Sequence, residues 1–244
     1  MTFSKEDIFQ IADSIIFFLE NNFKEIVCTG TYEDTYNDEE AYQVYLQLKK
    51  VADYIFEHDL KDAKVSVLNE SLGRKTNLKA YPCEAFGDSI CFNPSGRIYP
   101  CQRFCPTSMT EEKSKEYIIG DCSYGAFEFP HFLTRDKLKV MTVETQFDQE
   151  CKDCLISSGC GWCPGYCAEL GHFNKRTKGN CKFHQAKVLA QYYYKNRRAL
   201  EWRDVAPLEV NIPEDWALKI VSKEEFENLK RWASKAENEF TYNS

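Results

Sequence analysis

The most reactive side chains of the chain form a dense run of six cysteines. Two, five, two, three and thirteen residues separate its successive members, which are Cys151, Cys154, Cys160, Cys163, Cys167 and Cys181. Two cysteines with two residues between them can direct both thiolates at one metal centre from a single tight turn. Gly159, Gly161 and Gly165 lie among these cysteines, and glycine lets backbone amides approach metal-bound sulfur closely. The spacing therefore predicts a cysteine-ligated metal centre.

Three earlier cysteines, Cys83, Cys91 and Cys101, form a second and looser group. Because a cubane iron–sulfur cluster needs four ligands, the two groups together fit two such clusters. Two Cys-x2-Cys pairs also suit a tetrahedral four-cysteine zinc site, and disulfides are a third use of clustered cysteines. The spacing alone indicates a metal but leaves its identity open.

Composition and charge limit the cellular compartments and the kinds of partner that we expect for this chain. The N-terminal apolar stretch is interrupted by Asp13 and no small-residue cleavage site follows, so we expect no signal peptide and a cytoplasmic location. Because the cytosol keeps thiols reduced, twelve cysteines there favour metal binding over disulfides. The formal net charge of −7 argues against nucleic acid or an anionic membrane as the main partner. The sequence contains no apolar run of membrane-spanning length.

Residues 1–82 alternate between helical and extended patterns. Ser4 and Asp7 fit a capping box for a first helix, and Asn37 or Asp38 can cap a second one. Apolar residues recur at helical spacing behind both caps, at Ile8, Ile11, Ile15 and Leu19 and then at Val44, Leu48, Val51 and Ile55. The runs 25–30 and 64–68 are expected to be strands. This alternation predicts an α/β fold containing part of a parallel layer or barrel.

The composition changes at Pro82, and the next hundred residues are rich in cysteine, glycine and proline. Residues 91–101 fit a β-hairpin with its turn at 93–96. Residues 134–146 fit either a short helix or a short strand.

Two helices are expected in the last third of the chain. The first follows Cys181, and its aromatic stripe at 192–194 is assigned to the core. The second begins at Ser222, where Glu225 completes a capping box. Its apolar side is predicted to carry Phe226, Leu229 and Trp232.

The cysteine pattern resembles a known family motif. Cys83-x12-Gly96-x4-Cys101, a gap, Cys-x2-Cys-x5-Cys and a distal cysteine together resemble the SPASM motif. That motif belongs to the C-terminal module of radical S-adenosylmethionine (SAM) peptide maturases. The strings NPSGRIYPCQRF, CKDC, SSGCGWCPGY and CKFHQAKVLAQYYY carry the likeness, which continues into EDWALKIVSKEEFENL.

The resemblance implies three domains. Residues 1–82 are similar to the second half of the partial (β/α) barrel of radical SAM enzymes. Residues 83–200 would form the SPASM domain, with a hairpin, loops, short helices and two auxiliary 4Fe-4S clusters. Residues 201–244 would be a helical C-terminal extension.

The ligands of both clusters carry over by position within that resemblance. The outer cluster, auxiliary II, would be held by Cys151, Cys154, Cys160 and Cys181. The inner cluster, auxiliary I, would be held by Cys83, Cys91, Cys101 and one cysteine of the dense run. The family pattern places that last ligand where this chain has Pro164. Cys163 is therefore the preferred eighth ligand, with Cys167 as the alternative.

The remaining cysteines and histidines are expected to have ordinary structural roles. We interpret Cys28, Cys105 and Cys122 as buried small residues. We interpret His131, His172 and His184 as packing or surface residues.

The family's SAM-cleaving motif is missing from this chain. That motif, Cys-x3-Cys-x2-Cys, holds a cluster with one iron open to SAM. The two partial matches, at 101–105 and 163–167, have Ser108 and Leu170 in place of the third cysteine. The chain also has no Gly-Gly pair for the family's SAM-binding motif. SAM is therefore not expected to bind this chain alone.

Three functional hypotheses remain. In the first, the chain is the cluster-bearing part of a radical SAM maturase that modifies or thioether-crosslinks a ribosomally made precursor peptide, together with a separate chain carrying the SAM-cluster half. In the second, it is a stand-alone iron–sulfur module that relays electrons or binds a peptide. In the third, it is a zinc-stabilised interaction protein. The first hypothesis also predicts an exposed hydrophobic patch on residues 1–82.

Overall fold

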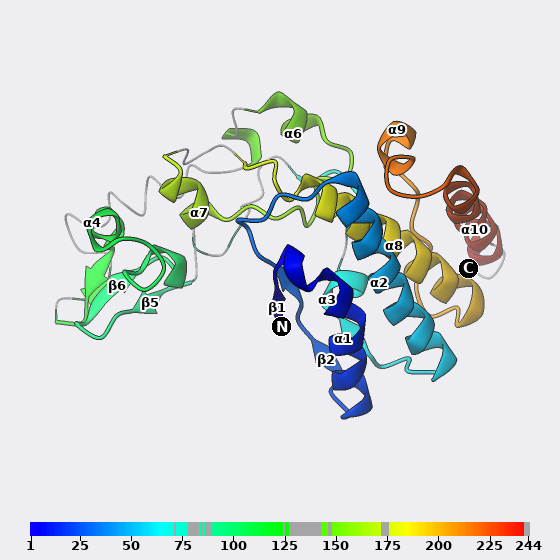
Figure 1. Cartoon of the computed structure of the whole chain (residues 1–244), viewed down its shortest axis with the longest axis horizontal. Helices are drawn as coiled ribbons and strands as arrows, with labels where there is room; N and C mark the ends of the chain where they lie inside the picture. The colour runs from blue at the N-terminus through cyan, green and yellow to red at the C-terminus, as the bar shows by residue number, and fades with distance from the viewer. Residues whose placement is uncertain are drawn as a thin grey trace. The chain divides into compact units, whose positions relative to one another are not determined.

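The chain forms a mixed α/β protein with long helices and very short strands (Figure 1). The computed structural model describes residues 1–70, 72–77, 83, 85, 89–123, 125–126, 143–145, 148–171 and 176–241. The chain divides into two compact units. Unit 1 comprises residues 1–75, 154–161 and 178–244, and unit 2 comprises residues 76–153 and 162–177.

Unit 1 contains the long helices. They are α1 (Ile11–Glu20), α2 (Asp38–Glu57), α8 (Cys181–Glu201) and α10 (Lys223–Thr241). The short helices α3 (Ser66–Asn69) and α9 (Glu214–Ala217) join them, and a 3-10 helix at Lys5–Gln10 leads into α1.

The helix starts follow the capping signals in the sequence. Ser4 and Asp7 form the predicted capping box before the 3-10 helix. Asn37 caps α2, and Glu40 completes a second capping box there. The amide of Glu225 donates to Ser222 Oγ over 3.1 Å at the start of α10. Such caps satisfy backbone amides that have no partner within the helix, so the predicted starts of all these helices are confirmed.

The strands of unit 1 pair in parallel. β1 (Thr2–Phe3) pairs with β3 (Thr29–Gly30), and β2 (Glu25–Ile26) pairs with β4 (Lys64–Val65). The predicted strand at 25–30 is therefore present as two short pieces. The predicted strand at 64–68 is wrong after its second residue, because α3 begins at Ser66.

Two contacts explain that early end. Asn69 Oδ1 accepts a hydrogen bond from the Val65 amide over 2.7 Å, which closes a helical turn. Ser66 Oγ accepts from the Cys28 amide over 2.9 Å, so this turn is fixed to the neighbouring segment. The pairing is that of an α/β layer, and a partial barrel remains a prediction.

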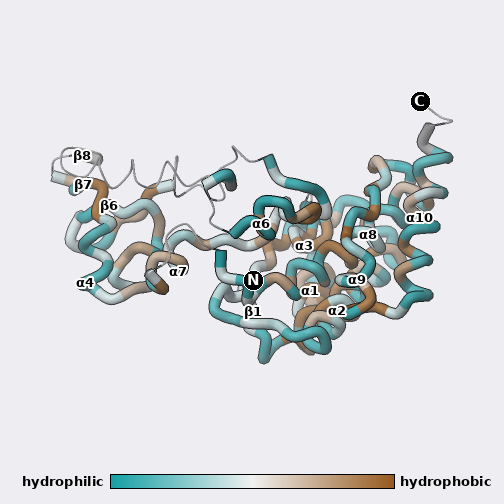
Figure 2. The backbone as a smooth tube through the Cα atoms, turned by 90° about the horizontal axis from the view of Figure 1, so that it is seen from above, coloured by the Kyte–Doolittle hydropathy of each residue, from teal (hydrophilic) through white to brown (hydrophobic). Residues whose placement is uncertain are grey.

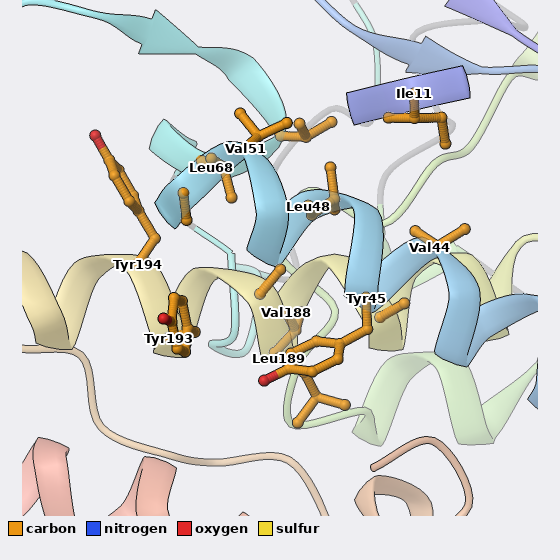
Figure 3. Close-up of a cluster of buried hydrophobic side chains, with 14 of the residues drawn as sticks. Ile11, Val44, Tyr45, Leu48, Val51, Leu68, Val188, Leu189, Tyr193 and Tyr194 are labelled. Carbon is orange, nitrogen blue, oxygen red and sulfur yellow. The ribbon is translucent and has the colours of Figure 1, made fainter. Parts of the chain in front are cut away.

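The core of unit 1 lies between α2 and α8. Figure 3 shows Tyr45 of α2 beside Val188 and Leu189 of α8, and Leu48 and Val51 of α2 belong to the same buried cluster. All five are at most 1% exposed. Each fully buried aliphatic side chain contributes about 2 kcal/mol of hydrophobic stabilisation, so this contact is a main source of the stability of unit 1.

The C-terminal helix covers another part of α8. α10 alternates polar and apolar residues along its length in Figure 2, and it buries Phe226 and Leu229. Trp232 packs its ring 5.4 Å from the ring of Tyr193. The aromatic stripe at 192–194 is buried, as predicted.

Unit 2 is built around a four-stranded antiparallel sheet. The strands follow one another in space as β5 (Cys91–Phe92), β6 (Arg97–Tyr99), β7 (Gly120–Asp121) and β8 (Gly125–Ala126). Short helices accompany them at α4 (Glu111–Ser114), α6 (Gln149–Asp153) and α7 (Pro164–Glu169). There are also 3-10 helices at Gln102–Phe104, Lys115–Tyr117 and Val143–Thr145.

The predicted hairpin at 91–101 is confirmed. Asn93 Oδ1 accepts hydrogen bonds from the amides of Ser95 and Arg97, and Gly96 adopts a φ of +84°. Positive φ is strained for residues with a side chain, so a glycine at 96 suits this turn. The undecided segment 134–146 lies outside the described residues except for the 3-10 helix at its end.

The compact units and the predicted domains divide the chain differently. Residues 178–200, assigned from the sequence to the SPASM domain, pack in unit 1 with residues 1–75. The domain limits at 82/83 and 200/201 remain predictions about function. None of the helices in the described ranges is both long and apolar enough to cross a membrane.

Candidate metal centres

Six cysteines gather in and around one small hydrophobic core of unit 2. Tyr99, Phe104 and Trp162 form the centre of this core and are at most 4% exposed. The cysteines that belong to the core or pack against it are Cys83, Cys91, Cys101, Cys105 and Cys167. Cys163 follows Trp162 directly in the chain. All four ligands predicted for the inner cluster therefore lie in this unit.

The β5–β6 hairpin brings Cys91 and Cys101 to the same end. Cys91 lies opposite Tyr99 in the antiparallel register, and Cys101 follows Tyr99 by two residues. The chain then enters a 3-10 helix, in which the Phe104 amide donates to the Cys101 carbonyl over 3.1 Å. This turn places Cys105 back toward the hairpin.

Cys105 lies among the predicted ligands. Its Sγ is 3.4 Å from Cys91 Sγ and 3.8 Å from the Cys101 carbonyl oxygen. Cys105 is buried, as predicted, but its position beside Cys91 was not foreseen. Its spacing of four residues from Cys101, about one helical turn, was the one signal in the sequence.

Helix α7 carries the two candidate eighth ligands. Cys163 is its N-cap residue, and Pro164 starts the helix with a backbone already suited to it. The amide of Cys167 donates to the Cys163 carbonyl over 3.0 Å, so both cysteines share the first helical turn. Cys163 is half-buried and Cys167 is buried.

An ion pair and a glycine fix α7 against the turn that follows Cys101. Arg103 Nη2 lies 2.9 Å from Glu169 Oε2. A Cβ at Gly165 would approach Arg103 Cβ to 2.9 Å and Arg103 Cγ to 2.4 Å. Only glycine therefore allows this close approach, which holds Cys163 near the group around Cys101.

Burial keeps the thiols of Cys101 and Cys105 in their neutral form. It is the main cause that raises the pKa of Cys101 to about 11, and the neighbouring Cys83 and Cys163 act in the same direction. It is also the main cause that raises the pKa of Cys105 to about 12, together with the hydrogen bond to Cys91. Metal ligation requires thiolates, so a cation bound here would have to displace protons.

The ligands predicted for the outer cluster lie on α6, on the loop 154–161 and on α8. Cys151 is in α6, Cys154 and Cys160 begin and nearly end the loop, and Cys181 is the first residue of α8. The amide of Cys160 donates to the Ser157 carbonyl over 3.2 Å, so the loop turns tightly between its two cysteines. Cys154 and Cys160 of the loop and Cys181 of α8 belong to unit 1.

His184 joins this loop to α8. Its Nε2 lies within hydrogen-bonding distance of the Ile156 carbonyl, and it is buried. The packing role predicted for His184 is confirmed, and the bond holds the loop beside the first turns of α8. His131 and His172 lie outside the described residues.

The donor set suits a cysteine-ligated centre, because none of the twelve cysteines forms a disulfide. In the described part of the chain, however, no three Cys, His, Asp or Glu side chains already converge as a metal would require. The residue types and their grouping are those of a cysteine-ligated centre, while the described side chains do not form its coordination geometry. The assignment of individual ligands stays a prediction.

Two of the three cysteines predicted to be ordinary buried residues are buried. Cys28 is 6% exposed and Cys105 is 3% exposed. Cys122 is exposed, so its predicted burial is wrong. It follows β7 at a turn of the sheet, where its amide donates to the Gly96 carbonyl, and this turn leaves its side chain at the surface.

Comparison with known proteins does not assign the chain to a family. No protein-family model matches the chain, and no curated protein is significantly similar to it. The resemblance to SPASM-type maturases rests on the sequence motifs alone and stays a prediction.

Proposed function

We propose that the chain is an iron–sulfur protein, the cluster-bearing part of a radical SAM peptide maturase that acts with a separate SAM-cluster half. One observation carries the iron–sulfur part of this proposal. Cys83, Cys91, Cys101 and Cys163, far apart in the sequence, belong to one small unit whose core contains Cys105 and Cys167. A group of six buried or half-buried thiols has few roles in a reducing compartment other than metal ligation.

The residues around the inner group suit this role. The buried rings of Phe104 and Trp162 form the apolar core on which these cysteines pack, and an apolar surrounding is one of the factors that set the potential of a bound cluster. Arg103 lies near Cys163, where its positive charge lowers the thiol pKa against the raising effect of burial. A cluster held by four cysteines has no open iron, so it would supply electron transfer or structural bracing.

A partner chain fits the exposed apolar residues at the start of unit 1. Phe17 and Phe23 are 59% and 54% exposed, and both rings pack on Phe18. Apolar side chains grouped in this way often mark an interaction site. The missing SAM-cluster half is the occupant that the proposed function requires. The substrate class implied by the resemblance is a ribosomally made precursor peptide.

Zinc is the second candidate, because the Cys91 and Cys105 sulfurs are 3.4 Å apart. Two cysteines on a tetrahedral zinc ion have sulfurs roughly 3.8 Å apart, given zinc–sulfur bonds of about 2.3 Å. This pair is therefore close to the geometry of a zinc site. A zinc-stabilised interaction protein would use the same cysteines without redox chemistry.

The deciding experiment is a metal and sulfide analysis of the whole chain, purified and reconstituted without oxygen. We expect about eight irons per chain with matching sulfide, which corresponds to two four-iron clusters. About one zinc without sulfide would contradict the iron–sulfur proposal and support the interaction protein.

Single substitutions then assign the ligands. Cys91→Ala should lower the iron content from about eight to about four, because one cluster loses a ligand. Cys122→Ala is the matched control, since this cysteine belongs to the same unit but is exposed, and it should leave the iron content unchanged. Whichever of Cys163→Ala and Cys167→Ala causes the same loss identifies the eighth ligand. Equal iron in the Cys91 and Cys122 variants would refute the assignment of Cys91.

A further inference from the structure

Unit 1 contains a cavity of about 160 Å³, and none of the predicted cluster ligands is among the residues that line it. Its wall includes Cys28 and Gly30 from the segment around β3, Gly159 from the loop 154–161, and Phe183 and Lys187 from α8. Glu70, which follows α3, completes the wall. Among the described residues of this wall, Cys28 is the one cysteine, and it is not a predicted ligand.

Lys187 has a buried amino group that forms no close ion pair in the described part of this cavity. The residue is only 9% exposed. Its Nζ lies 5.3 Å from the centre of the Phe183 ring, and among the described residues it makes no hydrogen bond or ion pair. Burial lowers the pKa of Lys187, and the Glu70 carboxylate opposes this shift from a distance. A buried ammonium is more stable when a group in direct contact compensates its charge, and the carboxylate of a ligand can supply that contact.

Glu70 supplies the opposite charge on the same wall. A methyl group at Gly159 would meet Glu70 Oε2 at 3.9 Å, which places this carboxylate beside the loop 154–161. The carboxylate is exposed and forms no ion pair within 4.0 Å in the described part of the chain. Lys187 and Glu70 therefore face one cavity without reaching each other.

The polar groups of Cys28, His184 and Asn180 in the wall are neutral or already hydrogen-bonded, so Lys187 and Glu70 supply its charges. Burial raises the pKa of the Cys28 thiol to about 11, so this thiol is neutral. His184 Nε2 is engaged with the Ile156 carbonyl. Asn180 Nδ2 donates to the carbonyls of Thr31 and Tyr32. The cavity thus offers one cation and one anion to a bound molecule.

We propose that this cavity binds a small zwitterion, an α-amino acid with a short side chain, with its carboxylate at Lys187 and its ammonium group at Glu70. The volume limits the size of the ligand, because a cavity of about 150 Å³ holds a molecule such as benzene, with roughly six heavy atoms. L-Alanine has this size and both charges. The proposed contacts use no cysteine ligand, and the wall passes beside Cys160, which Gly159 and Gly161 flank.

Calorimetric titration of the full, metal-reconstituted chain with three probes tests this site. L-Alanine carries both charges, propionate only the negative one and ethylamine only the positive one. We expect saturable binding of L-alanine, and at least about ten-fold weaker binding of the other two, because each leaves one charge of the cavity without a partner. No binding of L-alanine, or equal binding of propionate, would overturn the proposal.

Two variants assign the charges. Lys187→Met should abolish binding of L-alanine while the chain stays folded, because the substitution replaces a buried amino group that has no close ion pair by an apolar side chain of similar length. Glu70→Gln changes an exposed residue and should reverse the preference, so that propionate binds more tightly than L-alanine. Unchanged preference in the Glu70 variant, or unchanged binding in the Lys187 variant, would also overturn the proposal. Both variants should keep the wild-type metal content, which separates this site from the cysteine centres.

Discussion

Cys28 shows how the burial of a single thiol makes the stability of the folded protein depend on pH. Its side chain lies in the core of unit 1, and its amide and carbonyl both bond to the Ser66 hydroxyl. Removal from water raises the pKa of the thiol from 9.0 to about 11. The folded state therefore holds this proton to a higher pH than the unfolded state does.

We predict a loss of stability above pH 9 that depends on Cys28. A group whose pKa is raised by folding stabilises the protein fully below its unfolded pKa, and the contribution disappears as the pH rises through the folded pKa. The window thus runs from pH 9 to about pH 11, and the loss is about 2 kcal/mol. Urea unfolding of wild-type protein and Cys28→Ala at pH 8 and pH 10.5 measures it. Parallel pH dependence in both proteins would exclude the thiol as the cause.

At the scale of elements, the loop 154–161 depends on Gly159. This residue adopts a φ of +69°, and a Cβ there would approach Leu72 Cδ2 to 1.9 Å. Gly171 adopts a similar φ of +73°, but a Cβ there would meet nothing within 4 Å. Replacing either glycine by a residue with a side chain would strain the backbone. Only at Gly159 would the new side chain also clash with a neighbouring residue, Leu72.

We predict that Gly159→Ala destabilises the protein more than Gly171→Ala does. Both variants should lose about 1 kcal/mol from the left-handed backbone. Only the Gly159 variant must also displace Leu72, at an added cost of about 1–3 kcal/mol. Chemical denaturation gives both free energies of unfolding, and losses of equal size would show that the loop does not pack tightly against Leu72.

The elements that the sequence predicted well are those set by local contacts. Capping boxes at Ser4 and Asn37 and the turn at Gly96 involve residues at most four positions apart. The features that were missed depend in large part on distant contacts. The early end of β4 involves a local bond between Val65 and Asn69, but also a bond between Ser66 and Cys28 across 38 positions. Cys105 meets Cys91 only because the hairpin folds back. The cysteine groups were visible in the spacing, but their side-chain arrangement depends on such long-range packing.

At the scale of the whole molecule, the exposed aromatic residues at the end of α1 should govern association. The rings of Phe17 and Phe23 both pack on the ring of Phe18. The ring centroids are 5.8 Å apart for Phe17 and Phe18, and 5.4 Å apart for Phe18 and Phe23. Burying such side chains against a partner removes apolar surface from water, which is favourable by roughly 25 cal/mol per Å². In the isolated chain, this surface stays in contact with solvent.

We predict that the isolated chain self-associates through these residues. Sedimentation velocity should show larger species that grow with concentration, and the double variant Phe17→Ser, Phe23→Ser should be monomeric. Leu218→Ser is the control, since it also removes an exposed apolar residue of unit 1 (40% exposed) but lies at the end of α9, and it should associate like the wild type. Exposed substitutions of this kind change stability by about 0.5 kcal/mol or less, so unfolding will not explain the difference. A wild-type chain that stays monomeric and binds no apolar dye would leave the aromatic cluster without a role in docking a partner.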